Sequence, residues 1–472
     1  MLLAKRLTQL RKLGRAVSAT ELLEHYRAFS RSRREFIKNL GYGAAAVGAM
    51  PLLNACSSGG SAGPLSDFPR IAIVGGGMAG LNAAYNLQRS GIRAHVYEAT
   101  SRAGGRMYSA ADIMSSGLIT ELGGEFIDSI HDDMLALASE FGLELLDTQA
   151  PSEQSLITGY FFDGQYYSEA QVIEAFAPLA ASISADYDST GEIVDFQNEG
   201  GATALDRTSI AEYLEQIGAT GFIRKLLDVA YLTEYGLEND QQSSLNLIFL
   251  IGTDQDSFEI FGESDERYKI KGGNQRIIDE LANRLADQIS FEFKLEALRQ
   301  KGAGYALAFQ SPSGTKEIDA DFVILTIPFT LLRQVDLQIE LPAFKSTVIN
   351  QLSYGTNAKI LVGFSNRIWR DLGLNGEIFT DENFQLCWDN SQLQAGESGG
   401  ITFYSGGRAG LEVGSGSAEQ QASRLMTGFE KALPGASAAR NGRASRFHWP
   451  TFPFTLGSYA AYRPGDWTTI AG

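Results

Sequence analysis

The sequence predicts an α/β fold in which a parallel-sheet domain is interleaved with a second, α+β domain. Short apolar runs typical of buried parallel strands occur at 70–74 and 321–327, and further strands are expected at 94–97 and 289–293. Residues 127–260 carry apolar side chains mainly at helical spacing, most clearly at 134–141, 210–217 and 222–232. The chain has 472 residues, about three times a typical domain, so two joined domains are expected.

The first 56 residues have the order of an export signal. Ser32 to Lys38 (SRREFIK) resembles a twin-arginine motif, and the Gly/Ala-rich apolar run that follows is too short to span a membrane. Cys56 stands where a lipoprotein signal would be acylated, although plain cleavage is also possible. Residues 57–68 are rich in Ser and Gly and predict a flexible tether. We therefore expect an exported bacterial protein, in the periplasm or anchored on the extracytoplasmic side, that meets the membrane only through its signal or lipid.

The charge balance argues against nucleic-acid binding. The net charge is -17, and residues 1–55 alone hold 10 basic and 3 acidic residues, so the body is more acidic still. Such a body lacks the basic surface that neutralises phosphates. It could attract cationic substrates, or the acid could simply keep the surface soluble. With two Cys and four His, none of them in a metal-binding pattern, neither a disulfide framework nor a metal site is expected.

A dinucleotide-binding fingerprint follows the first strand. In Gly75-Gly76-Gly77-Met78-Ala79-Gly80, the first glycine is expected to make a tight turn and Gly77 to let the backbone approach a pyrophosphate. Gly80 would let the helix that starts near Met78 and Ala79 pack closely on the strand. The free N–H groups of that helix would face the phosphates. This unit predicts a Rossmann-like domain.

Glu98 closes the second strand, 18 residues past Gly80. A carboxylate at this place can accept hydrogen bonds from a ribose hydroxyl pair and would repel a 2′-phosphate, so NADP is disfavoured. The fingerprint alone does not separate FAD from NAD.

The next segments resemble the flavin monoamine oxidase family and, more distantly, protoporphyrinogen oxidases and carotenoid desaturases. Glu98 to Arg106 (EATSRAGGR) is similar to the family's continuation of the fingerprint, and Glu121 to Glu125 (ELGGE) to its segment beside the isoalloxazine. The resemblance implies FAD and a GR2-type flavoprotein fold. It places these residues at the cofactor: Arg102, Gly104, Gly105, Arg106, Gly123, Gly124 and Glu125.

Later motifs follow in the family order. Tyr268 to Gln275 resembles the return to the FAD domain, and Leu295 stands where the family's backbone meets the adenine. The family has a lysine that holds a water against flavin N5 at the position of Lys359, although a solvated lysine on a strand would look the same. Tyr459 matches one wall of an aromatic cage for the amine, which an ordinary core tyrosine would also match.

The resemblance also implies the domain plan. The expected segments are a signal (1–56), a tether (57–68), a first FAD-binding part (69–150), a helical substrate-domain part (151–265), a second FAD-binding part (266–338), a second substrate-domain part (339–447) and the start of a last FAD-binding segment (448–472). Because the family continues beyond this point, we expect a C-terminally incomplete chain.

The implied activity is FAD-dependent oxidation of an amine, with O2 reduced to H2O2. Ser458 replaces the Cys that binds flavin covalently in some members, so FAD is expected to be non-covalent. Residues 124–130 contain no Arg to hold a substrate carboxylate, which favours an amine over an amino acid. Two alternatives are open: a desaturase or protoporphyrinogen-type oxidoreductase, and a non-catalytic lipoprotein with the same fold.

Overall fold

The computed structural model describes residues 69–254 and 256–472, and these fall into two compact units. The first unit contains residues 69–102, 284–326 and 335–339. The second contains 103–283, 327–334 and 340–472. Each unit is described by itself. The predicted signal and tether lie outside the described residues.

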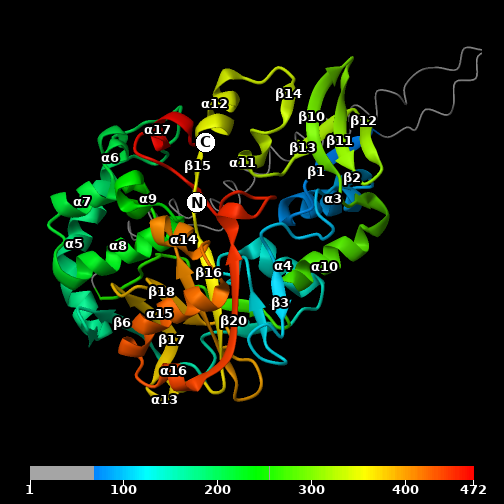
Figure 1. The fold of residues 1–472 in the computed structure, drawn as a ribbon. Coiled ribbons are helices and arrows are strands. Elements are labelled where there is room, and N and C mark those ends of the chain that lie inside the picture. Colours follow the sequence, from blue (N-terminus) through cyan, green and yellow to red (C-terminus); the bar gives the residue numbers. More distant parts are fainter. Residues whose placement is uncertain (1–68, 255) are drawn as a thin grey trace, which may run out of the picture. The chain divides into compact units, whose positions relative to one another are not determined.

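The first unit contains the predicted parallel sheet (Figure 1). Its strand order is β13–β1–β2–β9, and every neighbouring pair is parallel. Helix α3 connects β1 to β2, and both strands are largely buried, as their apolar sequences require. The bounds are β1 Ile71–Val74, α3 Met78–Arg89, β2 Ala94–Tyr97, 3₁₀ turn η2 Ala286–Gln288, β9 Ile289–Ser290 and β13 Phe322–Leu325.

One strand of this sheet differs from the expectation. The apolar run at 321–327 predicts a buried strand, but β13 is an edge strand of the parallel sheet, Phe322 is exposed and its next three residues are only partly buried. A second, mainly antiparallel sheet of order β12–β11–β10–β14 completes the unit. Its bounds are β10 Lys294–Lys301, β11 Gly304–Ser311, β12 Gly314–Ala320 and β14 Asp336–Gln338.

A seven-stranded sheet forms the centre of the second unit, with the order β20–β16–β19–β18–β17–β6–β7. All seven residues of β16 and of β19 are buried. The strand bounds are β6 Ile157–Phe162, β7 Gln165–Tyr167, β16 Ala358–Phe364, β17 Leu374–Thr380, β18 Leu386–Asp389, β19 Gly399–Ser405 and β20 Arg440–His448. Three two-stranded pairs accompany it: β3 Ser109–Ala111 with β4 Ile119–Glu121, β5 Leu145–Asp147 with β8 Tyr268–Ile270, and β15 Ser353–Tyr354 with β21 Ala460–Ala461.

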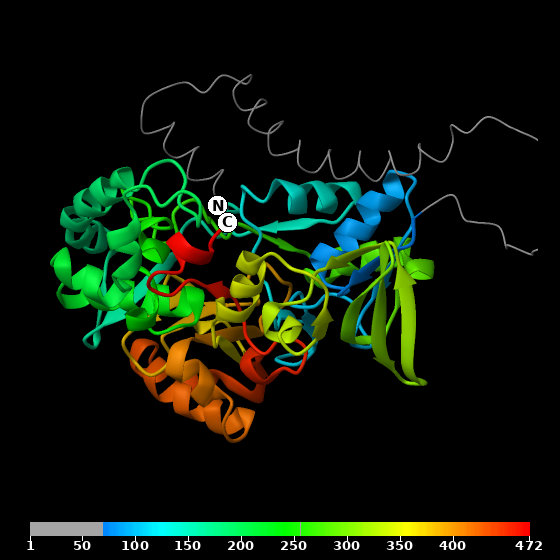
Figure 2. The same cartoon turned by 90° about the horizontal axis from the view of Figure 1, so that it is seen from above.

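Two groups of helices in this unit stand out. The helices from α5 to α9 lie together, green in Figure 2, and α15 and α16, orange, lie elsewhere in the unit. The helix bounds are α4 Asp132–Glu140, α5 Glu169–Ser189, α6 Thr203–Arg207, α7 Ile210–Gln216, α8 Gly221–Tyr235, η1 Asn239–Gln241, α9 Ser244–Ile248, α10 Gln275–Arg284, α11 Phe329–Leu332, α12 Ala343–Gln351, α13 Ile368–Asp371, α14 Gly407–Val413, α15 Ala418–Ala432, α16 Ala436–Ala439, η3 Trp449–Thr451 and α17 Trp467–Ile470.

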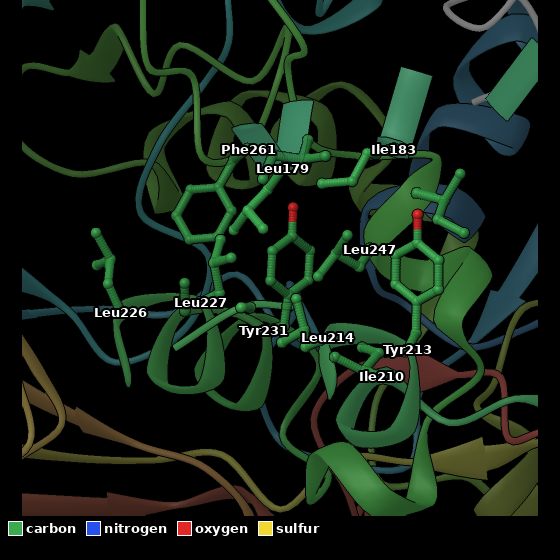
Figure 3. Close-up of a cluster of buried hydrophobic side chains, with 14 of the residues drawn as sticks. Leu179, Ile183, Ile210, Tyr213, Leu214, Leu226, Leu227, Tyr231, Leu247 and Phe261 are labelled. Carbon is green, nitrogen blue, oxygen red and sulfur yellow. The ribbon is translucent and has the colours of Figure 1, made fainter. Parts of the chain in front are cut away.

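Capping and packing explain the green group. Ser168 and Ser209 start α5 and α7 with reciprocal capping boxes, and Gly236 ends α8 in the left-handed conformation. Side chains of α5, α7, α8 and α9 then share one apolar core, in which Tyr213 and Tyr231 are almost fully buried (Figure 3). The predicted helices at 134–141, 210–217 and 222–232 are confirmed by α4, α7 and α8.

The expectation that residues 127–260 are mainly helical omitted three strands. Strands β5, β6 and β7 interrupt the helices, and β6 pairs in parallel with β17, more than 200 residues later in the chain. A local hydrophobic pattern carries no information about such a distant partner.

The compact units are not the same division as the domain plan expected from the sequence, which stays a prediction. Residues 103–150 and 266–283 lie in the second compact unit. The reason is their pairing: β5 pairs with β8, and Ile127 bridges Tyr268, so these segments hold each other. No helix in the described part of the chain is long and apolar enough to cross a bilayer.

Candidate active site

The glycine-rich turn of the first unit has the geometry that its sequence predicts. Gly75 has a φ of 109°, which favours glycine. A Cβ at Gly80 would lie 1.9 Å from the Gly75 carbonyl oxygen, so no other residue fits without moving the turn. Gly77 is extended, Met78 and Ala79 begin α3, and no side chain caps this helix. The first N–H groups of such a helix lack intrahelical acceptors and can bind an anion.

Glu98 lies directly beside this turn. Its side chain is buried, and Oε2 accepts a hydrogen bond from the Gly76 N–H at 2.7 Å. Oε1 accepts from the N–H and the hydroxyl of Thr100, both at 2.8 Å. The Phe293 N–H donates to the Glu98 carbonyl at 2.8 Å, which brings the buried Leu295 to the same end of the sheet. The glycines, the carboxylate and Leu295 are therefore gathered within one unit.

The continuation of the fingerprint crosses from one unit to the other. Arg102 is the last residue of its segment in the first unit and is partly buried. Gly104 and Gly105, in the second unit, have φ values of 120° and 55°. This tight turn requires glycine, because both angles disfavour a side chain. Arg106 follows, and its Nη1 donates to the Ser458 carbonyl at 2.5 Å. Arg106 thus holds the segment that carries Tyr459.

Gly123 and Gly124 differ although they are neighbours. A Cβ at Gly123 would lie 1.8 Å from the Arg106 carbonyl oxygen, whereas a Cβ at Gly124 would meet nothing within 4 Å. The same Arg106 carbonyl accepts from the Gly124 N–H at 3.1 Å. Gly123 is therefore required by packing within the protein. Gly124 is exposed, so packing against Arg106 does not require glycine at this position.

Lys359 is buried on β16 and is not a solvated side chain. Its Nζ donates to the carbonyl oxygens of Glu121 at 3.0 Å and Gly123 at 2.9 Å, and it forms an ion pair with Glu125 Oε2 at 3.1 Å. These three acceptors match the three protons of an ammonium group. The nitrogen also lies 5.1 Å from the centre of the Trp388 ring.

Glu125 is bound by a second buried lysine. Lys269 Nζ, from β8, donates to Glu125 Oε1 at 3.0 Å and lies 4.9 Å from the Phe126 ring centre. Burial by itself raises the pKa of Glu125, but Lys269 and Lys359 outweigh it and hold that pKa below its usual range. The carboxyl is therefore ionised between two cations. Glu121, which lacks such partners, has its pKa raised to about 7 by burial.

Aromatic side chains lie around these charges. Tyr459 is 48% exposed as a residue, and burial of its hydroxyl raises its pKa to about 12. Tyr404 acts on the pKa of the Tyr459 hydroxyl, and the Tyr404 ring centre lies 5.2 Å from that of Trp388. Since Tyr404 is the partner of Lys359 in the β16–β19 register, the aromatic group and the lysine belong to one cluster.

Carboxyl groups adjoin this cluster. Burial, together with Asp128, raises the pKa of Glu234 to about 7, and burial also raises the pKa values of Glu266 and Glu377. Glu234 and Glu266 both contribute to the raised pKa of Tyr459. A cavity of about 550 Å³ in the second unit is lined by Glu266 and Glu377 together with Phe126 and Trp388. Arg267 also lines it, but Asp147 binds that guanidinium at 2.8 and 2.9 Å.

Ser458 and Cys387 bear on covalent attachment of a cofactor. The buried Ser458 hydroxyl donates to Asn357 Oδ1 at 2.5 Å and accepts from the Asn357 N–H at 3.2 Å. Cys387, the cysteine within the described residues, is fully buried on β18. Ser458 has no sulfur that could form a thioether, and Cys387 Sγ lies 3.7 Å from the Gly376 carbonyl oxygen.

The structure brings the predicted residues together in two sets. Gly75 to Gly80, Glu98 and Leu295 gather in the first unit, and Arg106, Glu125, Lys359 and Tyr459 in the second. The sequence did not single out Lys269, Trp388, Tyr404, Glu234 or Glu266. Of these residues, only Lys269 could have been noticed in the sequence, because it lies within the Tyr268–Gln275 motif. Among the described residues, no group of three or more His, Cys, Asp or Glu side chains is arranged to hold a metal ion.

Comparison with known proteins agrees with this arrangement. The family model described as "Flavin containing amine oxidoreductase" matches residues 78–470. An L-amino acid dehydrogenase of Synechocystis sp. is 25% identical, covering 84% of this chain and 85% of its own. A pseudooxynicotine dehydrogenase of Pseudomonas sp. is 24% identical, over 93% and 87%.

Solved structures share the fold. Putrescine oxidase bound to putrescine superposes with a TM-score of 0.71 at 20% identity, covering 85% of this chain and 89% of that one. Cyclohexylamine oxidase from Brevibacterium oxydans superposes with a TM-score of 0.70 at 18% identity, covering 86% and 90%. A mixed α/β fold with a Rossmann-like FAD-binding part and a substrate domain follows from this likeness.

Proposed function

Because this chain belongs to the family of flavin-containing amine oxidoreductases, we propose that it oxidises a cationic small-molecule amine with FAD and passes the electrons to O2. The enzyme is an FAD-dependent oxidoreductase that acts on amines. The identity of the substrate, the use of O2 and the roles of individual residues are the proposal. In the overall reaction the amine loses two electrons and two protons to become an imine. Water hydrolyses the imine, and O2 takes up the electrons and protons to give H2O2.

The residues of each unit fit FAD. The turn at Gly75–Gly80 and Glu98 would hold its diphosphate and ribose, because close packing has left the backbone there uncovered by side chains. Leu295 would meet the adenine. Arg102, Gly104, Gly105 and Arg106 would lie near the diphosphate and flavin, and Gly123, Gly124 and Glu125 beside the ring. Bound FAD supplies the two-electron acceptor.

One observation carries the substrate class: the half-exposed Tyr459 has its pKa raised to about 12 by burial and then by the electrostatic influence of Glu234 and Glu266. Aromatic faces and carboxylates both attract cations. Glu234, whose pKa of about 7 leaves it ionised only above this pH, would then repel the carboxylate of an amino acid, whereas the raised pKa of Glu266 favours its neutral form. Arg267 offers no compensation, because its charge is already balanced by Asp147. These residues would orient the amine, and burial beside the rings would favour its reactive, neutral form.

Matched substrate pairs test this proposal. FAD-loaded protein is given putrescine and ornithine, or phenethylamine and phenylalanine, and H2O2 is measured. We expect the amine of each pair to react at least about tenfold faster, which corresponds to one repelled charge. Faster turnover of the amino acids would overturn the assignment. Two relatives are dehydrogenases, so a redox dye is included in place of O2. If the dye is reduced but no H2O2 forms, O2 is not the electron acceptor, and the assignment of an amine substrate still stands.

We also propose non-covalent FAD and export. A serine hydroxyl at Ser458 cannot form the cysteinyl thioether, so flavin should leave the protein on acid precipitation. A yellow pellet would contradict this. Export is supported by the twin-arginine pattern at Arg33 and Arg34, outside the described residues. Changing both to lysine should leave the protein in the cytoplasm, and C56S should release it from membranes if Cys56 is lipidated.

A further inference from the structure

Two buried lysines share one carboxylate in the second unit, and they are not equivalent. Lys359 has an acceptor for each of its three protons, as described above. Lys269, whose side chain is only 9% exposed, has a single acceptor among the described residues, Glu125 Oε1. Lys359 is thus fixed by the protein on every side. Lys269 serves chiefly to bind Glu125.

Glu125 is the link between them. Its two oxygens bind different lysines, Oε1 at 3.0 Å and Oε2 at 3.1 Å. Asn274 Nδ2 donates to the Glu125 carbonyl at 2.8 Å, which fixes the backbone as well. The segment that follows β4 carries Glu125, and lysines from β8 and β16 meet at its carboxylate.

The charges in this group do not cancel. Two ammonium groups and one carboxylate leave a buried excess of one positive charge. The other titratable groups that act on Glu125 or Lys359 are Glu121, whose raised pKa keeps it largely neutral below about pH 7, and Glu266. Removing a partner from a buried pair is costly, because an uncompensated charge is left behind. Glu125 without Lys269 would keep one cation and lose the other.

We propose that Lys269 is a positioning residue of the active site: by binding Glu125 Oε1 at 3.0 Å, it fixes the side chain whose Oε2 binds Lys359, and so holds Lys359 in one place beside the cofactor. This inference rests on the proposed function, in which Lys359 and the Glu121–Glu125 segment flank the flavin ring. Lys269 contacts neither substrate nor reacting atoms in this assignment. Its effect reaches the reaction only through Glu125.

The test uses FAD-loaded protein and three variants. K269M removes the charge while keeping a long apolar stem, and K269R keeps the charge. K271M is the matched control, because Lys271 lies two residues away in an exposed ion pair with Glu144. The pH dependence of kcat/KM and of the visible flavin spectrum is recorded for each.

For K269M we expect the acid limb of both pH profiles to move up by about one pH unit, since a nearby opposite charge shifts a carboxyl pKa by one to three units. The value of kcat should fall about tenfold while KM changes less than twofold. K269R should restore both limbs, and K271M should match the wild type. Unchanged limbs in K269M, or an equal shift in K271M, would overturn the proposal.

If K269M fails to fold, K269Q takes its place, because its amide can still donate a hydrogen bond to Glu125. The acid limbs of both pH profiles must move in K269Q as well. Wild-type protein that binds no FAD or oxidises no amine refutes the proposed function. Active wild-type protein with a silent K269M or K269Q refutes the role of Lys269 alone.

Discussion

Two adjacent glycines, Gly123 and Gly124, allow a sharp test of which glycines serve the fold and which serve a ligand. In G123A, the new Cβ would stand 1.8 Å from the Arg106 carbonyl oxygen, whereas real Cβ contacts keep at least 3.0 Å. The two segments must therefore separate by about 1.2 Å. In G124A the new methyl group meets nothing within 4 Å.

The magnitudes follow from these distances. Overpacking of this kind costs about 1–3 kcal/mol, so for a chain of this length G123A should lower the Tm of the apoprotein by about 1–3 °C. G124A should leave that Tm unchanged or slightly raised, because alanine restricts the unfolded chain. If the space beside Gly124 belongs to the flavin, G124A should instead weaken FAD binding by about tenfold or more.

The assay combines thermal unfolding of the apoprotein with FAD titration followed by flavin fluorescence. The reasoning is wrong if G123A is as stable as the wild type, since the backbone would then yield without cost. It is equally wrong if G124A destabilises the apoprotein. A G124A variant that binds FAD normally would remove Gly124 from the proposed cofactor site.

Three further predictions concern charged and aromatic groups. E98Q should weaken FAD binding about tenfold or more in calorimetry, because a neutral amide is a poorer acceptor for the Gly76 N–H and for a ribose hydroxyl; equal affinity would exclude Glu98 from the site. For Glu234, whose pKa burial raises to about 7, the carboxyl is neutral below this pH and ionised above it. The inhibition constant of benzyltrimethylammonium, a permanent cation, should therefore fall up to about tenfold as pH rises through 7, and E234Q should abolish this step. Tyr459, with a pKa of about 12, stays neutral in any ordinary assay, so Y459F should change kcat but leave the pH limbs of kcat/KM in place; a lost limb would show that Tyr459 titrates.

Local sequence determined the nucleotide-binding half. The strand, the turn at Gly75–Gly80, helix α3 and Glu98 follow one another within 30 residues, and the structure assembles them as their spacing predicts. This succeeds because each requirement is local: a left-handed φ, a close helix–strand approach and a carboxylate at a strand end. Family resemblance then extended the prediction to Lys359 and Tyr459, one motif at a time.

Only the tertiary structure decided what these residues touch. Lys359 proved to be buried because β16 lies inside a seven-stranded sheet whose strands come from distant parts of the chain. Lys269, Trp388 and Tyr404 joined the site for the same reason: pairings such as β5 with β8 and β16 with β19 have no local signature. A sequence pattern reports which face a side chain occupies. The charged groups that surround this side chain depend on long-range strand pairing. Such pairing sets the ionisation of Glu125 and the position of Lys359.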